Sequence, residues 1–425
     1  MKKTSFIRFL LTVTAAVLLF AIPYAVRADS LPMLGTSGKQ IVNSSSNQEV
    51  KLRGVNAGGL FVTEDYMTNR PSPSHPSGAI QYEDDVDMMN QLESQYGDEK
   101  TQQITSKWQD NYWTEQDFEN VKNMGMNVIR LPFAYYNLID YANYDPSSTS
   151  EVTLRDGAFD KLDSFIDQAG QHGLYVILDL HGAFGSQSGQ ENSGDKTTDP
   201  KLFKDDSEGQ RDRALTNSLW EKVAEHYQGN STVAGYDLLN EPKNYQDGSG
   251  RTDSQVFDYY DQLINTIRGK DSDHIIFLES TWEPSDMPNP ADKGWTDNNI
   301  VYQYHFYAWD PDNSSADAIR NFYNGKVDEI SEANYNVPAY IGEFSIPQNS
   351  YAPTSDDWQN VLSTFNKNDY SWTIWNYKTT ADMNTFGLYQ EDRQNQDPNS
   401  DDWGQAQNLQ PNTTIQQAVK NTIGQ

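Results

Sequence analysis

The chain has 425 residues, which is enough for one large barrel or two ordinary domains. Its formal net charge is −30, so its surface would repel nucleic acid. Cysteine is absent, which excludes disulfides, a thiolate nucleophile and a cysteine-ligated metal. Stability must then come from a large core, which favours one big domain.

The N-terminus has the three parts of a signal peptide. A basic start over residues 1–8 precedes an apolar run over residues 9–25, and small residues follow up to Ala28. The run is short for a membrane span and has no stop-transfer flank, so a membrane anchor is the weaker alternative. We predict a signal peptide over residues 1–28 and a secreted, extracellular mature chain that is free of the membrane.

The mature chain begins with a polar stretch over residues 29–49, predicted to be an N-terminal lead-in. The catalytic domain is predicted over residues 50–396, and its first strand over residues 50–56. A long segment over residues 57–113 follows. Because structureless connections of this length are uncommon, we expect it to be partly helical or to form a wall of a cleft. A capped amphipathic helix is predicted over residues 114–124.

From residue 127 onward, apolar strands alternate with amphipathic helices. Further strands are predicted over residues 127–132, 174–181, 233–239, 274–280, 300–307, 337–344 and 371–377. Helices are predicted over residues 157–172, 211–227, 254–268, 316–335 and 356–366. Repeated strand-helix units with nearly continuous apolar strands predict a single (β/α)8 TIM barrel. A doubly wound sheet would usually carry a glycine-rich phosphate loop, and the sequence has none.

The last part of the chain, residues 397–425, is predicted to be a polar C-terminal tail with one helix that packs on the barrel.

Polar or aromatic side chains stand at or just after the C-terminal ends of the predicted strands, where a barrel places its chemistry. They are Arg130, His181, Asn240, Glu241, His305, Tyr307, Glu343 and Trp375. Glu241 in L-L-N-E-P and Glu343 in I-G-E-F are carboxylates that end buried strands. An unpaired buried charge is costly, so we interpret these two residues as a catalytic pair.

Hydrolysis of a glycosidic bond needs one carboxyl group to protonate the leaving oxygen and a second to attack or to activate water. Asn240 would hydrogen-bond a sugar hydroxyl, and Arg130 would keep the nucleophilic carboxylate ionised. The aromatic and imidazole side chains suit stacking and hydroxyl recognition. Each residue alone has a purely structural alternative, such as a core ion pair or a hydrogen-bonded core histidine. A zinc site is disfavoured because no His-x-x-x-His pair exists.

The chain also resembles a known family. The motifs that carry the resemblance are N-V-I-R-L-P (127–132), D-L-H-G (179–182), L-L-N-E-P (238–242), Y-H-F-Y (304–307), I-G-E-F (341–344) and W-T-I-W-N-Y (372–377). Over residues 50–378 they resemble glycoside hydrolase family five, a retaining family with a (β/α)8 barrel. The resemblance implies Glu241 as acid/base and Glu343 as nucleophile, about 5–5.5 Å apart. The residues that it implies for the glycone site are Arg130, His181, Asn240, His305, Tyr307 and Trp375. It implies no metal and no organic cofactor.

Residues 54–64 and 181–194 are most similar to the exo-acting β-1,3-glucanases of that family. In those enzymes a glutamate after a Gly-Gly pair grips the non-reducing glucose, and Glu64 stands in that place. Leu60 and Tyr66 replace tryptophans of that group, and Gln190 stands where an aromatic residue usually clamps the acceptor sugar.

We therefore expect a secreted, monomeric, retaining β-glycosidase that acts on β-glucans or β-glucosides as an exo-β-1,3-glucanase. An endo-β-1,4-glucanase, a β-mannanase or a glycoconjugate β-glycosidase of the same family is the alternative. From another class, a non-catalytic carbohydrate-binding barrel would keep the aromatic residues but not both glutamates.

Overall fold

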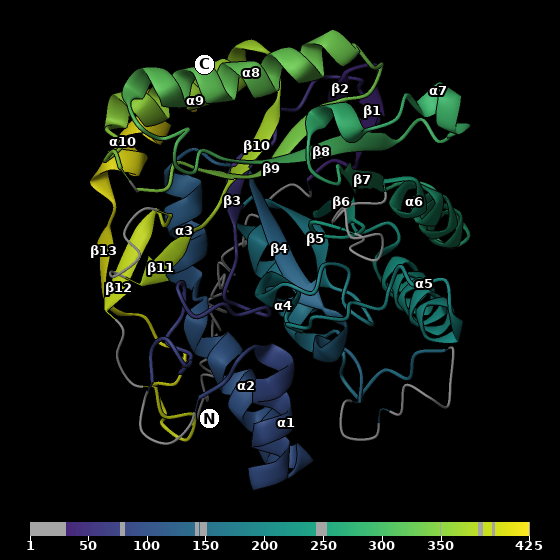
Figure 1. Ribbon diagram of the computed structural model, residues 1–425, viewed down its shortest axis with the longest axis vertical. Helices are drawn as coiled ribbons and strands as arrows, with labels where there is room; N and C mark the ends of the chain where they lie inside the picture. The colour runs from purple at the N-terminus through teal and green to yellow at the C-terminus, as the bar shows by residue number, and fades with distance from the viewer. Residues whose placement is uncertain are drawn as a thin grey trace, which may run out of the picture.

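The computed structural model describes most of the chain after residue 30 (Figure 1). The described residues are 31–76, 81–140, 144, 151–243, 253–348, 350–380, 386–392 and 396–424. The predicted signal peptide, residues 1–28, lies outside them. Within the described ranges, no helix is both long enough and apolar enough to cross a lipid bilayer.

Eight parallel strands close into a barrel in the order β10-β3-β4-β5-β6-β7-β8-β9. They are β3 Arg53–Asn56, β4 Val128–Ala134, β5 Tyr175–Gly182, β6 Val233–Asp237, β7 Ile275–Glu279, β8 Ile300–Tyr307, β9 Ala339–Ser345 and β10 Ser371–Ile374. The barrel closes where β10 pairs with β3, with Trp372 opposite Arg53. Each strand falls on a segment that the sequence predicted as a strand, so the predicted (β/α)8 barrel is confirmed.

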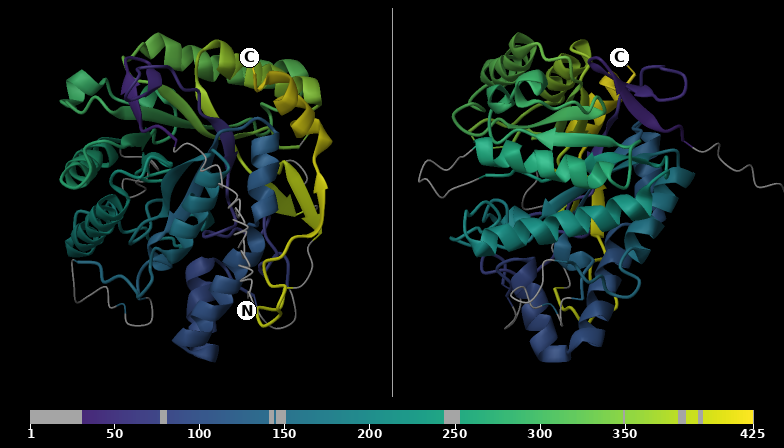
Figure 2. Two further views of the ribbon diagram at one scale, coloured as in Figure 1. Left: turned by 180° about the vertical axis from the view of Figure 1, so that it is seen from behind. Right: turned by 90° about the vertical axis from the view of Figure 1, so that its right-hand side faces the viewer.

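Helices follow most of the strands and cover the outside of the barrel (Figures 1 and 2). They are α3 Glu115–Asn123, α4 Asp160–Gln171, α5 Ser207–Tyr227, α6 Asp253–Arg268, α7 Pro290–Lys293, α8 Ala316–Ala333 and α9 Ser355–Lys367. Helix α9 shows why these segments are helical. Thr354 and Asp357 form a capping box at its start, and Trp358, Val361 and Phe365 are buried on one face.

The long segment between the first two barrel strands is partly helical, as the sequence predicted. It contains α1 Asp85–Tyr96 and α2 Asp98–Tyr112, which pack together at one end of the molecule (Figure 1). Trp108 Nε1 on α2 donates to the carbonyl of Gly59 at 2.8 Å, and the Tyr112 hydroxyl donates to the carbonyl of Gly58 at 3.0 Å. These bonds hold the stretch before Glu64 against the barrel.

The predicted lead-in contains a hairpin that the sequence pattern did not show. Strands β1 Leu34–Ser37 and β2 Gln40–Asn43 form it. Gly38 turns the chain between them with a φ of +59°, which favours glycine. Leu34 and Ile41 are buried in one cluster with residues at the starts of barrel strands, including Val128. Strands of four residues are too short to show an alternating pattern, so the sequence did not predict this cover over the N-terminal end of the barrel.

After β10 the chain forms a small three-stranded sheet and a last helix. They are β11 Lys378–Thr380, β12 Tyr389–Asp392, β13 Gln407–Pro411 and α10 Thr413–Thr422. Helix α10 packs along α9, and Asn366 Nδ2 donates to the carbonyl of Thr422 at 2.9 Å. The C-terminal segment therefore lies on the outside of the barrel (Figure 2). The domain boundary at residue 396 stays a prediction.

Candidate active site

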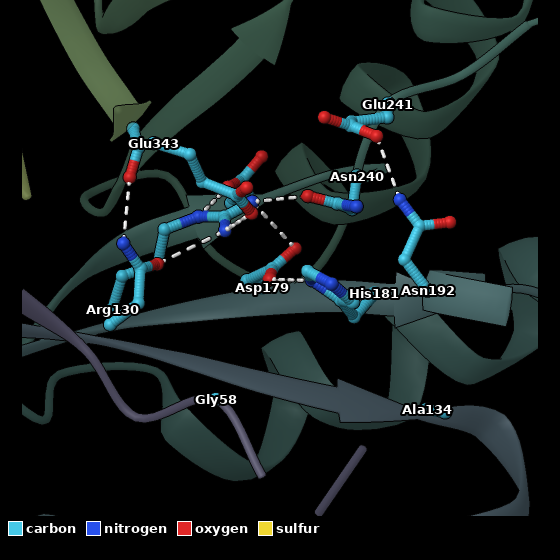
Figure 3. A network of polar contacts seen from close by, with 12 residues as sticks. Gly58, Arg130, Ala134, Asp179, His181, Asn192, Asn240, Glu241 and Glu343 are labelled. Carbon is cyan, nitrogen blue, oxygen red and sulfur yellow. Dashed lines mark hydrogen bonds and ion pairs between the residues drawn. The ribbon is translucent and has the colours of Figure 1, made fainter. Parts of the chain in front are cut away.

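A cavity of about 550 Å³ lies at the C-terminal ends of the barrel strands. The predicted site residues that line it are Glu64, His181, Glu241, His305, Tyr307, Glu343 and Trp375. Arg130 and Asn240, the other predicted site residues, are buried next to this lining and contact each other. The structure therefore brings all of these side chains together. Figure 3 shows five of them, Arg130, His181, Asn240, Glu241 and Glu343.

Glu241 reaches the cavity because the chain turns sharply after β6. The strand predicted over residues 233–239 ends at Asp237, and the carbonyl of Leu238 accepts a hydrogen bond from Trp220 Nε1 at 3.1 Å. Glu241 has a φ of +44°, in the left-handed region, which costs a non-glycine residue on the order of 1–3 kcal/mol. Surrounding contacts must hold Glu241 in a conformation that a free chain would avoid.

Arg130 on β4 is the buried centre of the polar cluster. Its Nη1 donates to Glu343 Oε1 and its Nε donates to Asp237 Oδ2, both at 2.8 Å. Its Nη2 donates to Asn240 Oδ1 at 2.9 Å and lies 3.1 Å from Asp179 Oδ1. Burial lowers the pKa of Arg130, but Asp179 and Asp237 outweigh burial and raise the pKa well above its ordinary value. Arg130 is therefore a fixed cation beside Glu343, and it orients Asn240.

Both oxygens of Glu343 are held by hydrogen-bond donors. Arg130 bonds Oε1, and the Tyr307 hydroxyl donates to Oε2 at 2.5 Å. His305 Nδ1 lies 3.6 Å from the same Oε2. The side chain of Glu343 keeps 5% of its surface exposed, toward the cavity. This carboxylate is therefore fixed in orientation and still open to a ligand.

Glu241 faces the same cavity and is held by different donors. Asn192 Nδ2 donates to Oε2 at 2.7 Å, as Figure 3 shows, and His305 Nδ1 lies 3.1 Å from Oε1. Burial raises the pKa of Glu241, but the hydrogen bond and charge of His305 outweigh burial and lower the pKa to about 2. One carboxylate oxygen of Glu241 and one of Glu343 lie within 4.8 Å of each other.

His305 on β8 lies among three carboxylates. Its Nδ1 is 3.1 Å from an oxygen of Glu241 and 3.1 Å from Glu279 Oε1. Burial lowers the pKa of His305, but Glu279, Glu343 and the hydrogen bond with Glu241 outweigh burial and raise the pKa to about 9. His305 is therefore a cation at neutral pH.

Glu241, His305 and Glu343 also bring three potential metal-ligand atoms within 4.8 Å of one another. Histidine ligates a metal through an unprotonated ring nitrogen. In this cluster the carboxylates hold a proton on His305 instead. A metal ion bound here would have to displace that proton.

His181 and Trp375 form one wall of the cavity. His181 Nδ1 lies 2.6 Å from Asp179 Oδ2, and its ring stacks on Trp375 with centroids 5.5 Å apart and planes 3° apart. Trp375 Nε1 donates to the Tyr66 hydroxyl at 2.6 Å, and that hydroxyl donates to Glu64 Oε1 at 3.4 Å. These contacts therefore form a continuous chain from His181 on β5 to Glu64.

Close packing requires the Gly-Gly pair that precedes Glu64. A Cβ at Gly58 would lie 2.9 Å from the Trp375 ring. Gly59 has a φ of +91°, and a Cβ there would lie 2.2 Å from the Tyr112 hydroxyl.

Burial raises the pKa of Glu64 well above its ordinary value, and neighbouring carboxylates raise it further.

Two exposed tryptophans line the cavity beyond the carboxylates. Trp282 is 59% exposed and Trp309 is 48% exposed, and they are the only large apolar side chains that stand out to this extent among the described residues. Lys243 Nζ lies 4.0 Å from the centre of the Trp282 ring. Exposed aromatic faces beside a cavity favour a ligand with a flat ring face. They follow β7 and β8, but exposure cannot be seen in sequence, so they were not predicted.

Four polar site residues were also missed. Asn192 lies in the 3₁₀ turn Glu191–Ser193, inside the stretch 181–194, where no role was predicted for it. Glu279 ends the buried strand β7, so the rule that identified Glu343 could have found it. Asp179 and Asp237 are buried in strands β5 and β6, and only their contacts with Arg130 reveal their place.

This arrangement can break a bond placed between the two facing carboxylates, with one as nucleophile and the other as proton donor.

Sequence comparison agrees with this chemistry. The family described as Cellulase (glycosyl hydrolase family 5) matches residues 91–381. A β-xylosidase of Phanerodontia chrysosporium is 30% identical over 373 residues, which are 81% of this chain and 70% of that protein. A sporulation-specific glucan 1,3-β-glucosidase of Saccharomyces cerevisiae is 28% identical over 390 residues, which are 86% of this chain and 80% of that protein.

Solved structures share the fold. The rutinosidase from Aspergillus niger superposes with a TM-score of 0.61 at 18% identity, covering 79% of this chain and 92% of that one. The catalytic domain of an endoglucanase from Thermobifida fusca superposes with a TM-score of 0.54 at 16% identity, covering 92% and 97%. At such identities the likeness shows the barrel alone.

Proposed function

Because the chain belongs to the cellulase family, glycosyl hydrolase family 5, it is a glycoside hydrolase, and we propose that it is a retaining exo-β-1,3-glucanase. Glu343 acts as the nucleophile and Glu241 as the acid/base. The observation that carries the proposal is the approach of their oxygens to within 4.8 Å across one cavity. Retaining glycosidases hold these carboxyl groups about 5–5.5 Å apart, whereas inverting enzymes need about 6.5–9.5 Å for a water.

The first step forms a covalent glycosyl-enzyme. Glu343, held by Arg130 and Tyr307, attacks the anomeric carbon, while Glu241 gives a proton to the leaving oxygen. In the second step Glu241 takes a proton from water, which attacks the same carbon and releases Glu343. The low pKa keeps Glu241 ionised beside cationic His305, which is the form that can accept this proton.

Recognition of the glycone is assigned to the groups around the nucleophile. Asn240 Oδ1 accepts from Arg130, whereas its buried Nδ2 has no hydrogen-bond partner among the described residues. An unpaired buried donor is costly, so this amide is ready to donate to a sugar hydroxyl. Trp375, stacked on His181, offers a flat face to the sugar ring.

The exo mode and the β-1,3 linkage are supported by the end of the cavity around Glu64. Tyr66 links Glu64 to Trp375 in the cavity lining, and we propose that the Glu64 carboxylate binds the non-reducing end of a glucan. The yeast relative's name, glucan 1,3-β-glucosidase, agrees with this linkage. We propose that Trp282 and Trp309, which line the cavity, stack on acceptor sugars beyond the scissile bond. The predicted signal peptide supports secretion, and we propose that the exported enzyme is a monomer.

Product analysis tests the proposal. Purified enzyme is incubated with laminarin, carboxymethylcellulose, mannan, an aryl β-glucoside and an aryl β-xyloside, and the products are resolved by chromatography and mass. Glucose as the sole early product from laminarin is expected. Mixed oligosaccharides from any polymer would refute the exo mode, and cleavage of the xyloside alone would refute the glucanase assignment.

Two variants complete this experiment. Glu343→Gln should abolish hydrolysis with an unchanged melting temperature, and near-normal turnover would refute its role as nucleophile. Trp282→Ala should slow cleavage of laminarin more than cleavage of the aryl glucoside, because only the polymer reaches the acceptor side.

A further inference from the structure

Glu279, which none of the proposed roles uses, is the most closely engaged carboxylate around Glu241. It is the last residue of β7 and is 2% exposed. Its Oε2 accepts the backbone N–H of Glu241 at 2.8 Å and lies 3.3 Å from Gln303 Nε2. Its Oε1 lies 3.1 Å from His305 Nδ1. One side chain thus contacts both the backbone of Glu241 and the imidazole that touches the Glu241 carboxylate.

The backbone contact matters because of the left-handed φ of Glu241. Glu279 accepts a hydrogen bond from the backbone N–H of Glu241 itself, so this bond helps to hold Glu241 in its strained conformation. The preceding N–H, that of Asn240, is bonded to the carbonyl of Leu180 at 3.1 Å. Both ends of the Asn240 residue are therefore tied to neighbouring strands, and the Glu241 side chain is aimed at the cavity.

The imidazole contact is symmetric. His305 Nδ1 is 3.1 Å from Glu241 Oε1 and 3.1 Å from Glu279 Oε1, so its Nδ1–H faces both carboxylates. On the other side of the ring, the Gln303 amide packs against the Nε2 edge at 3.2 Å. Gln303 is packed so tightly that a Cβ at Gly342 would lie 2.6 Å from it. The ring therefore has a fixed orientation between the two carboxylates.

The resting cluster keeps its protons away from Glu241. His305 is a cation, and the pKa of Glu241 is lowered to about 2. Burial raises the pKa of Glu279 well above its ordinary value; cationic His305 opposes this effect, and nearby carboxylates strengthen it. An acid/base residue, however, needs a proton before it can serve the leaving group.

The charged and titratable groups that face Glu279 from the surrounding elements are Arg130 on β4, Asp237 on β6, Glu241 after β6 and His305 on β8. Glu343 on β9 acts on His305, and Tyr260 on α6 donates to the Glu279 carbonyl at 3.0 Å.

We propose that Glu279 is a positioning residue: its carboxylate fixes the backbone of Glu241 and keeps His305 protonated, so that His305 provides the proton that Glu241 gives to the leaving group. The Nδ1–H bond of His305 breaks as an O–H bond forms on Glu241 Oε1. A proton from bulk solvent then re-forms the Nδ1–H bond. Glu279 remains a carboxylate throughout, Glu241 ends as a neutral acid and His305 as the same cation. The proposal rests on the acid/base role proposed for Glu241.

The variant Glu279→Gln separates these two effects. Glutamine keeps the length and an oxygen that accepts the N–H of Glu241, but it has no charge to hold His305 protonated. The assay compares kcat/KM on 2,4-dinitrophenyl β-glucoside, whose leaving group departs without a proton, and on phenyl β-glucoside, which needs one. We expect a loss of about 10²-fold on the phenyl substrate and less than about 3-fold on the dinitrophenyl substrate. The alkaline limb of the phenyl pH profile should move to lower pH.

Asp271→Asn is the matched control. Asp271 also pairs with a buried histidine, His274, but at the opposite end of β7. It should lower the melting temperature and leave the leaving-group dependence and the pH profile unchanged. Equal losses on the two substrates in Glu279→Gln, or an unmoved alkaline limb, would overturn the proposal.

Two further measurements keep the outcomes distinguishable. If Glu343→Gln hydrolysed the substrates normally, the proposed catalytic pair would fail rather than the role of Glu279. If Glu279→Gln did not fold, the ¹⁵N NMR titration of His305 in the wild-type enzyme would decide. We expect His305 to stay protonated up to a pH of about 9, and titration near pH 6.5 would overturn the proposal.

Discussion

The Tyr307 hydroxyl offers a clean test of how the site holds Glu343. It donates to Glu343 Oε2 at 2.5 Å, while Arg130 bonds the other oxygen. Tyr307→Phe removes this one bond and keeps the ring. The centre of that ring lies 6.1 Å from the centre of the Phe386 ring and 6.0 Å from the centre of the Trp309 ring. The substitution therefore leaves the packing and the charges of the cluster in place.

The size of the effect follows from the type of bond. A hydrogen bond to a charged acceptor contributes about 1.5–3 kcal/mol. If Tyr307 orients Glu343 for attack, this range corresponds to a loss of about 10- to 150-fold in kcat/KM. The assay is kcat/KM on 2,4-dinitrophenyl β-glucoside, because this leaving group needs no proton from Glu241 and the rate reports the nucleophile.

Tyr323→Phe is the control for this measurement. The Tyr323 hydroxyl is also buried and donates to the carbonyl of Ser345, at the end of the strand that carries Glu343, at 2.6 Å. Because the acceptor is neutral and outside the cavity lining, the variant should lose about 1 kcal/mol of stability and keep its kcat/KM. A loss below about threefold in Tyr307→Phe would refute the argument that its hydroxyl orients the nucleophile.

Two predictions concern stability. His305 has its pKa raised from 6.5 to about 9, so its contribution is complete below pH 6.5 and is lost as the pH rises through 9. The difference between these two pKa values corresponds to about 3 kcal/mol of unfolding free energy. Urea unfolding at pH 6 and at pH 9.5 measures this change. The same unfolding free energy at both pH values would contradict the prediction. A Cβ at Gly235 would lie 2.3 Å from the carbonyl oxygen of Ile275, so Gly235→Ala should cost at least about 1–3 kcal/mol. Gly325→Ala, in open space on α8, should instead add about 0.5–1 kcal/mol, and thermal unfolding that ranks the two variants alike would refute this packing argument.

Much of the site followed from a rule about strand ends. Glu343 and Trp375 end or follow apolar runs that only a buried strand would contain, and parallel strands in a barrel bring their ends to one face. Glu279, the last residue of the buried strand β7, satisfies the same rule, so its place in the site could also be predicted from the sequence. Asn192 carried no such signal, because its place beside Glu241 depends on how a loop folds over the cavity.

The sequence by itself determined that this chain forms a (β/α)8 barrel with a carboxylate pair at one end, because strand periodicity and strand-end polarity are local properties. Only the tertiary structure decided the protonation of that pair. The charge of His305 depends on three carboxylates that come from β7, β9 and the turn after β6. A pKa is set by burial and by charges within a few ångströms, and those neighbours are known only after distant segments have been brought together.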